Sequence, residues 1–177
     1  FLNFSNPNGL PYTWLMEKLV GLADSIIVSN KFLQKRFTGH LVHHCRDTTV
    51  LNPDNFNSQE VKESLGLGNN RVIMFMGTPR AHKGIDDLIK AVDSLNYSDL
   101  RLVFIGAEPS FDPVRNSPYA TQEKVIVLPE IPFKELPKHL SAADILVVPQ
   151  RDTTDTQGQI PAKLFDAMAM AKPLITT

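Results

Sequence analysis

Short runs of consecutive apolar residues recur along the chain and alternate with segments of helical periodicity. Most of these runs are unbroken stretches of Val, Ile, Leu and Phe, a pattern typical of parallel strands that are buried on both faces. The runs predict strands at 25–29, 48–52, 71–77, 101–106, 124–129, 144–150 and 173–177.

Apolar residues at helical spacing lie between several of these runs. Ile85, Leu88 and Val92 repeat at i, i+3 and i+7, which predicts a helix with one apolar face. Similar stripes lie within residues 133–143 and 164–169. Alternating strands and helices of this kind predict a Rossmann-like α/β fold, with a parallel sheet covered by helices on both faces.

The first part of the chain has its own pattern. Residues 9–23 predict a helix, residues 25–29 a strand, and residues 30–37 a second helix. Ser29 or Asn30 is the expected N-cap of that second helix, because both side chains can accept a hydrogen bond from a free backbone N–H group.

A polar, loop-like segment then leads into the main series of strands and helices. We therefore expect residues 1–50 to end one domain or form a hinge, and residues 51–177 to form a Rossmann-like domain. The chain begins at Phe1 without Met and ends at Thr177 inside an apolar run. This indicates a piece of a longer protein, truncated at both ends.

Composition excludes several classes of protein. The 177 residues include one Cys and carry a formal net charge of −1. A single Cys cannot form an internal disulfide, and nucleic-acid binders normally carry a basic excess. The apolar runs are too short to span a membrane, and the first residues do not form a signal peptide. The expected compartment is the cytoplasm.

The segment that follows the apolar run 71–77 is the first candidate for binding chemistry. Arg80 and Lys83 lie between Gly77 and Gly84. Ligands of open parallel sheets bind at the carboxyl ends of the strands, and two cations near a helix start can hold phosphates there. The alternative is a solvated basic loop.

The polar segment before the last predicted helix is the second candidate. Pro161 suits a helix start, and Lys163 lies in the first turn, where a cation opposes the helix dipole unless an anion compensates it. Asp166 is placed to accept hydrogen bonds from vicinal hydroxyls such as those of a ribose. The alternative for Asp166 is simple stabilisation of the helix dipole.

A metal site is not expected. His43, His44 and Cys45 are metal-binding residue types, but three adjacent residues do not easily converge on one ion. The phosphate-binding motif G-x-x-x-x-G-K-[ST] and the dinucleotide motif G-x-G-x-x-G are also absent from the sequence.

Several strings, in this order, resemble the group 1 (family 4) glycosyltransferases. They are ADSIIVSNKFLQKRF, VLNPDNF, RVIMFMGTPRAHKGIDDLIKAV, LRLVFIGAEP, VIVLPEIPFKELPKHLSAADILVVPQ and PAKLFDAMAMAKPLITT. The resemblance implies the GT-B architecture, in which two Rossmann-like domains face a cleft, and places most of this chain in the C-terminal, donor-binding domain.

The resemblance also implies an activity. Such enzymes transfer a sugar, with retention of anomeric configuration, from a nucleotide-diphosphate donor to a glycan or lipid acceptor. They typically need no metal or cofactor. The expected location is the cytoplasm or the inner face of the membrane, with peripheral membrane contact through the N-terminal domain. A fragment of this size is expected to be inactive on its own.

The residue roles that follow from the resemblance match the two candidate segments. Arg80 and Lys83 would stabilise the donor diphosphate, and Asp166 would hold the ribose. The implied nucleotide-sugar-binding residues are Gly77, Thr78, Glu130, Ile131, Gln159, Ile160, Pro161, Lys163 and Asp166.

The chain departs from the family pattern E-x₇-E. The second acid is Asp166, and the position eight residues before it is Gly158. Asp152 and Asp155 lie nearby but out of register. Two alternative functions therefore stay open at this point: a GT-B-fold nucleotide-sugar epimerase, and a non-catalytic nucleotide-binding module.

Overall fold

The computed structural model of the chain describes residues 10–107, 117–119, 121, 123–153, 156 and 158–177. The chain forms two compact units. The first takes its residues from 1–45 and 152–161, and the second from 46–151 and 162–177. The division expected between residues 50 and 51 concerns the domains of the whole protein and stays a prediction.

The described residues of the first unit form two α-helices and a short parallel pair of strands. Asn30 is the N-cap of α2, as predicted, because its side chain accepts a hydrogen bond of 2.8 Å from the Leu33 N–H. The elements are α1 (Leu10–Leu19), the 3₁₀ turn η1 (Val20–Leu22), β1 (Ile27–Val28), α2 (Lys31–Phe37) and β2 (His40–Leu41).

The second unit is built on a five-stranded sheet with the order β5-β4-β3-β6-β7, in which all four neighbouring pairs are parallel. The strands are β3 (Arg71–Met76), β4 (Leu100–Ile105), β5 (Val125–Leu128), β6 (Ile145–Val148) and β7 (Leu174–Thr176). The helices are α3 (Ser58–Ser64), α4 (Ile85–Ser94), α6 (Leu136–Ser141) and α7 (Ala162–Ala169), with 3₁₀ turns η2 (Pro53–Asn55), η3 (Ala81–Lys83) and η4 (Phe133–Glu135).

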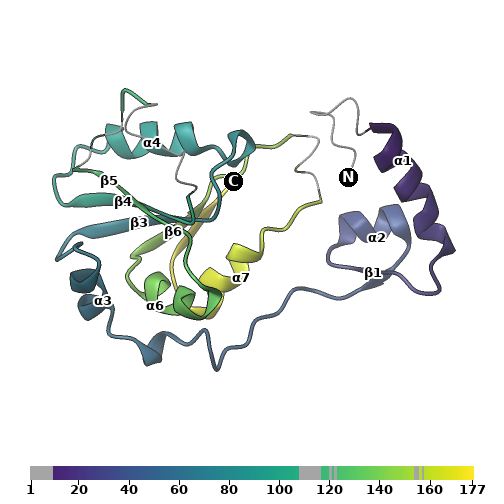
Figure 1. Ribbon diagram of the computed structural model, residues 1–177, viewed down its shortest axis with the longest axis horizontal. Helices are drawn as coiled ribbons and strands as arrows, with labels where there is room; N and C mark the ends of the chain where they lie inside the picture. Colours follow the sequence, from purple (N-terminus) through teal and green to yellow (C-terminus); the bar gives the residue numbers. More distant parts are fainter. Residues whose placement is uncertain (1–9, 108–116, 120, 122, 154–155, 157) are drawn as a thin grey trace. The chain divides into compact units, whose positions relative to one another are not determined.

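Alternate residues of the central strands enter two separate hydrophobic clusters. Met74 on β3 faces a cluster that includes residues of α3, α6 and α7. The next residue of β3, Phe75, faces the opposite way. It enters a second cluster that includes Phe104 of β4 and residues of α4. Figure 1 shows α4 on one face of the sheet and α3 and α6 on the other. The predicted sheet with helices on both faces is confirmed, and the continuous apolar strands reflect burial on both sides.

The predicted strand 48–52 is wrong. These residues form a turn, because the Asp47 carboxylate accepts hydrogen bonds from the Thr49 N–H and hydroxyl, and Pro53 follows with no N–H to donate. Leu51 is nevertheless only 2% exposed. Leu51 is therefore apolar because it is buried in the core, and not because it belongs to a strand.

The order of the strands reverses beside β3. The next strand along the chain, β4, pairs with one side of β3, and β6 pairs with the other side. Ligands of open α/β sheets bind where the order reverses, outside the carboxyl ends of the strands. The residues that directly follow β3 and β6 are therefore the place to look for a site.

No helix in the described ranges is both long enough and apolar enough to cross a bilayer.

Replacing Phe104 by Ala should lower the free energy of unfolding by about 3–5 kcal/mol, because the ring is fully buried and a cavity would remain. Its centroid lies 5.7 Å from that of Phe75, on the strand that carries the candidate site. Urea unfolding followed by circular dichroism measures the change. Leu95→Ala, at a position 42% exposed, is the control and should cost much less; equal losses would contradict the assignment of the core.

Candidate functional site

Gly77 directly follows β3, and the side chain of Lys163 on α7 packs against it. Its φ is +104°, in the region that favours glycine, and its N–H donates a 2.6 Å hydrogen bond to the Ile105 carbonyl. A Cβ atom here would collide with Nζ of Lys163, from the first turn of α7. The glycine therefore makes room for the lysine that the sequence singled out.

Lys163 and Lys83 meet at this point. Lys83 Nζ donates a 2.7 Å hydrogen bond to the Thr78 carbonyl, and its charge acts on the nearby ammonium group of Lys163. Lys163 Nζ lies 4.9 Å from the centroid of the Phe75 ring, within the range of a cation–π contact. Two side chains that normally repel are thus held together at the carboxyl end of β3.

The pKa values of both lysines are lowered. Burial is the largest cause of the shift in Lys163, followed by the charge of Lys83, and together they bring its pKa to about 8 against the partial compensation of Asp166. Burial also lowers the pKa of Lys83, and the charge of Arg80 adds to that effect. Arg80 is exposed and precedes η3. The three cations form a positive region suited to an anion.

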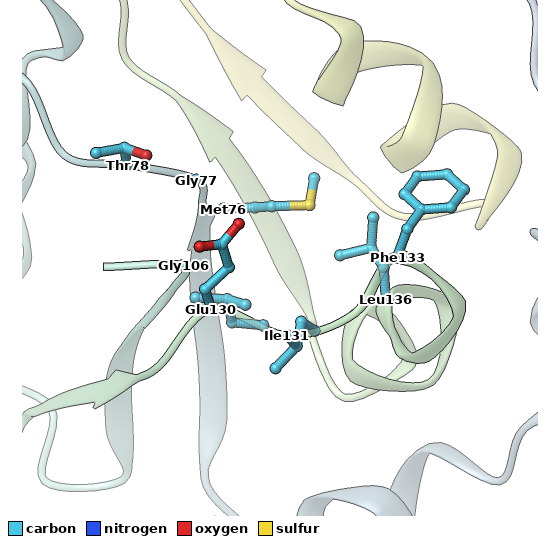
Figure 2. A pocket seen from close by; sticks show the side chains of 9 residues that line it. Met76, Gly77, Thr78, Gly106, Glu130, Ile131, Phe133 and Leu136 are labelled. Carbon is cyan, nitrogen blue, oxygen red and sulfur yellow. The ribbon is translucent and has the colours of Figure 1, made fainter. Parts of the chain in front are cut away.

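A pocket of about 300 Å³ opens beside this region, at the carboxyl ends of β3, β4 and β5. Figure 2 shows the Glu130 side chain directed toward Met76 and Gly77, while Phe133 and Leu136 approach from η4 and the start of α6. The lining residues are Met76, Gly77, Thr78, Ile105, Gly106, Glu130, Ile131, Phe133 and Leu136.

Four of the sequence-predicted residues thus share one pocket: Gly77, Thr78, Glu130 and Ile131. Gly77 and Thr78 are also the residues that Lys163 and Lys83 contact. The pocket and the positive region therefore adjoin each other in the fold. Their residues come from segments more than 80 positions apart, which only the fold brings together.

Asp166 is held by a partner that the sequence did not indicate. It is 4% exposed, and its Oδ1 accepts from Nε of Arg46, whose Nη2 also donates a 3.1 Å hydrogen bond to the Ala162 carbonyl. A buried carboxylate requires such a partner. No local pattern could reveal this pair, because 120 residues separate its members. The ribose role of Asp166 stays a prediction.

Gly158 belongs to the first unit and cannot carry a side chain as it stands. Its φ is +77°, and a Cβ atom would collide with the Phe32 ring. Its carbonyl accepts a 2.6 Å hydrogen bond from Nδ2 of Asn30, the N-cap of α2. The position where the family pattern has its first acid is thus fixed as glycine by the packing of α2.

The remaining predicted binding residues, Gln159, Ile160 and Pro161, also belong to the first unit, and the Gln159 N–H donates to the Thr156 carbonyl. Asp155 lies outside the described residues. Among the described side chains no group of three His, Cys, Asp or Glu could hold a metal ion.

Comparison with known proteins identifies the family. The family described as glycosyl transferases group 1 matches residues 70–177. Two curated relatives are each 30% identical: a Bacillus subtilis protein named as teichuronic acid biosynthesis glycosyltransferase TuaC, over 67% of this chain, and a GDP-mannose-dependent α-(1-6)-phosphatidylinositol monomannoside mannosyltransferase of Mycolicibacterium smegmatis, over 59%. Each match spans 28% of the relative's length.

Solved structures of other proteins share the fold. The crystal structure of Anabaena Alr3699/HepE in complex with UDP-glucose superposes with a TM-score of 0.72 at 16% identity, over 99% of this chain and 51% of that one. At this identity the likeness supports the fold alone. The family match, in contrast, covers more than half of the sequence, and the chain therefore belongs to the group 1 glycosyl transferases.

Proposed function

We propose that the protein transfers a sugar from a nucleotide-diphosphate donor to a glycan or lipid acceptor, with retention of configuration, and that the second unit binds the donor. The observation that carries this proposal is the meeting of Lys83 and Lys163 at the end of β3, beside a pocket of about 300 Å³. In this proposal, transfer takes place in the cytoplasm or at the inner face of the membrane.

The chemistry asked of the protein is mainly electrostatic. As the bond between sugar and diphosphate breaks, negative charge develops on the leaving diphosphate, and fixed cations stabilise it. Lys83, Lys163 and Arg80 supply those charges, and the N-terminus of α7 adds its free N–H groups. The names of the relatives support a nucleotide sugar as donor, since one is GDP-mannose-dependent and a structural neighbour holds UDP-glucose. The mechanism needs no metal.

A non-catalytic nucleotide-binding module is the second candidate, and the fixed glycine at position 158 favours it over the epimerase. The loss of an acid from the family pattern removes one contact expected to the donor sugar while leaving the cations intact. Turnover separates the two functions: a transferase hydrolyses or transfers a donor sugar, whereas a module binds the nucleotide without consuming it.

Donor binding should weaken as the pH rises past the pKa of Lys163, which is about 8. A bound diphosphate stabilises the protonated lysine, so affinity is full below that pKa and falls above it, by roughly tenfold between about pH 7 and about pH 9. Calorimetric titration with UDP and GDP, in buffers of different ionisation enthalpy, measures both affinity and proton uptake.

The variant Lys163→Met should bind both nucleotides at least about tenfold more weakly and lose most of this pH dependence, because a charge-assisted hydrogen bond contributes about 1.5–3 kcal/mol. Lys90→Met, on the exposed side of α4, is the matched control and should behave as the parent. A parent protein with pH-independent affinity would contradict the role of Lys163, and undetectable binding of every nucleotide would contradict the proposed function.

Asp166→Asn should weaken binding of GDP and UDP by roughly tenfold while leaving inorganic pyrophosphate almost unchanged, if the carboxylate accepts from ribose hydroxyls. Pyrophosphate carries the same anionic groups without a ribose. Equal changes for all three ligands would instead assign Asp166 a structural role, through its ion pair with Arg46. Thermal unfolding of the same variant reports that structural contribution separately.

In the full-length protein, Gly158→Glu restores the acid of the family pattern and should nevertheless lower activity. The backbone at position 158 has a positive φ, which residues with a side chain rarely adopt. The new side chain would also need the space that the Phe32 ring occupies. Gly158→Ala, which adds only the Cβ atom, is the matched variant and should lower sugar transfer in the same direction. Higher turnover in the glutamate variant would show that the loop rearranges and that the acid is merely missing.

A further inference from the structure

The pocket beside β3 combines apolar walls with one charged side chain. Its lining side chains are mainly hydrophobic, and Gly77 and Gly106 leave space rather than fill it. Only Thr78 and Glu130 among the lining residues carry polar side chains, and Glu130 carries the only charge. Pockets of this kind hold the flat part of a ligand by apolar contact and select it by their few polar groups.

The charge of Glu130 has the wrong sign for a diphosphate. Lys83 and Lys163 attract the anionic part of a donor to Gly77 and Thr78, and a carboxylate that faces the same phosphates would repel them. Figure 2 shows the Glu130 side chain directed toward Gly77 and Met76, which line the same pocket. A carboxylate in that place suits a ligand group that donates hydrogen bonds, which within a nucleotide means the base or the ribose.

The bases differ sharply in what they offer to a carboxylate, which only accepts hydrogen bonds. Guanine presents two adjacent donors, N1–H and the N2 amino group, which match the two carboxylate oxygens. Uracil presents one N–H flanked by two carbonyl oxygens, which the carboxylate repels. Adenine and cytosine each present an amino group beside an unprotonated ring nitrogen, so a second hydrogen bond cannot form.

We propose that Glu130 selects guanine, with its two oxygens accepting from N1–H and the N2 amino group, so that the donor is a GDP-linked sugar. This inference rests on the proposed function, since it assigns the base of the same donor. Met76, Ile131 and Leu136 supply the apolar surface against the ring, and the cations at the end of β3 hold the diphosphate.

Calorimetric titration of the purified protein with GDP, IDP, UDP and ADP tests the inference. IDP differs from GDP only by the missing N2 amino group and so isolates one of the two hydrogen bonds. GDP should bind at least about tenfold more tightly than UDP or ADP, and roughly tenfold more tightly than IDP, because each lost bond is one to a charged group.

The variant Glu130→Gln should remove this selectivity. An amide offers one acceptor and one donor, so it cannot accept from both guanine groups. GDP should weaken by roughly tenfold or more while IDP and UDP change little, and the preference for GDP over IDP should disappear. Glu135→Gln, on η4 and outside the pocket lining, is the matched control and should leave all four affinities unchanged.

The outcomes separate the two proposals. If all four nucleotides bind with similar affinity, or if Glu130→Gln weakens them equally, the guanine inference is overturned while the proposed function stands. If none of the four binds, the proposed function fails and the guanine inference fails with it. Tighter binding of UDP than of GDP would assign the pocket to a different base.

Discussion

Two lysine side chains are held against each other where β3 ends, and this contact is unfavourable in the absence of an anion. Burial and the nearby charges lower the pKa of both groups, which means that the charged form of each lysine is less stable here than in water. An anion that bridges Lys83 and Lys163 would offset the repulsion. The rest of the site is arranged around this contact: Gly77 leaves room for one lysine, and the Thr78 carbonyl orients the other.

An unfavourable contact between two lysines persists only where the packing of the surrounding fold holds both side chains in place. Phe75 enters the cluster under α4, and its neighbours Met74 and Met76 enter the opposite cluster, so β3 is packed on both faces up to its last residue. Its register with β4 and β6 is fixed along the strand. The strand end is therefore rigid where the lysines meet, and the free energy of core burial offsets the cost of the site.

Hydrophobic patterning was sufficient to predict the second unit but not everything that surrounds it. The continuous apolar runs of β3, β4 and β6 are strong signals because both faces are buried. The run 48–52 resembles a strand because Leu51 is buried, but it lies in a turn that Asp47 stabilises, and the short helix α3 lies in a polar segment whose pattern does not predict it. Periodicity reports burial more reliably than it reports backbone conformation.

The same limit applies to the site. Arg80 and Lys83 could be nominated from the sequence because they follow a predicted strand, and the carboxyl ends of parallel strands share one edge, whereas Glu130 followed only from the family resemblance. Arg46 could not, because its pairing with Asp166 is a tertiary contact without a local pattern.

The candidate site holds charges of both signs. The formal net charge of −1 conceals them, since it sums over the whole chain. Cations gather at the end of β3, and Glu130 lines the adjoining pocket together with Gly77 and Thr78. A diphosphate turned toward Glu130 would be repelled, and a base turned toward Lys83 and Lys163 would leave their charges uncompensated. In the proposed function, these charges would orient a nucleotide-sugar donor with its diphosphate at the cations and its base toward Glu130.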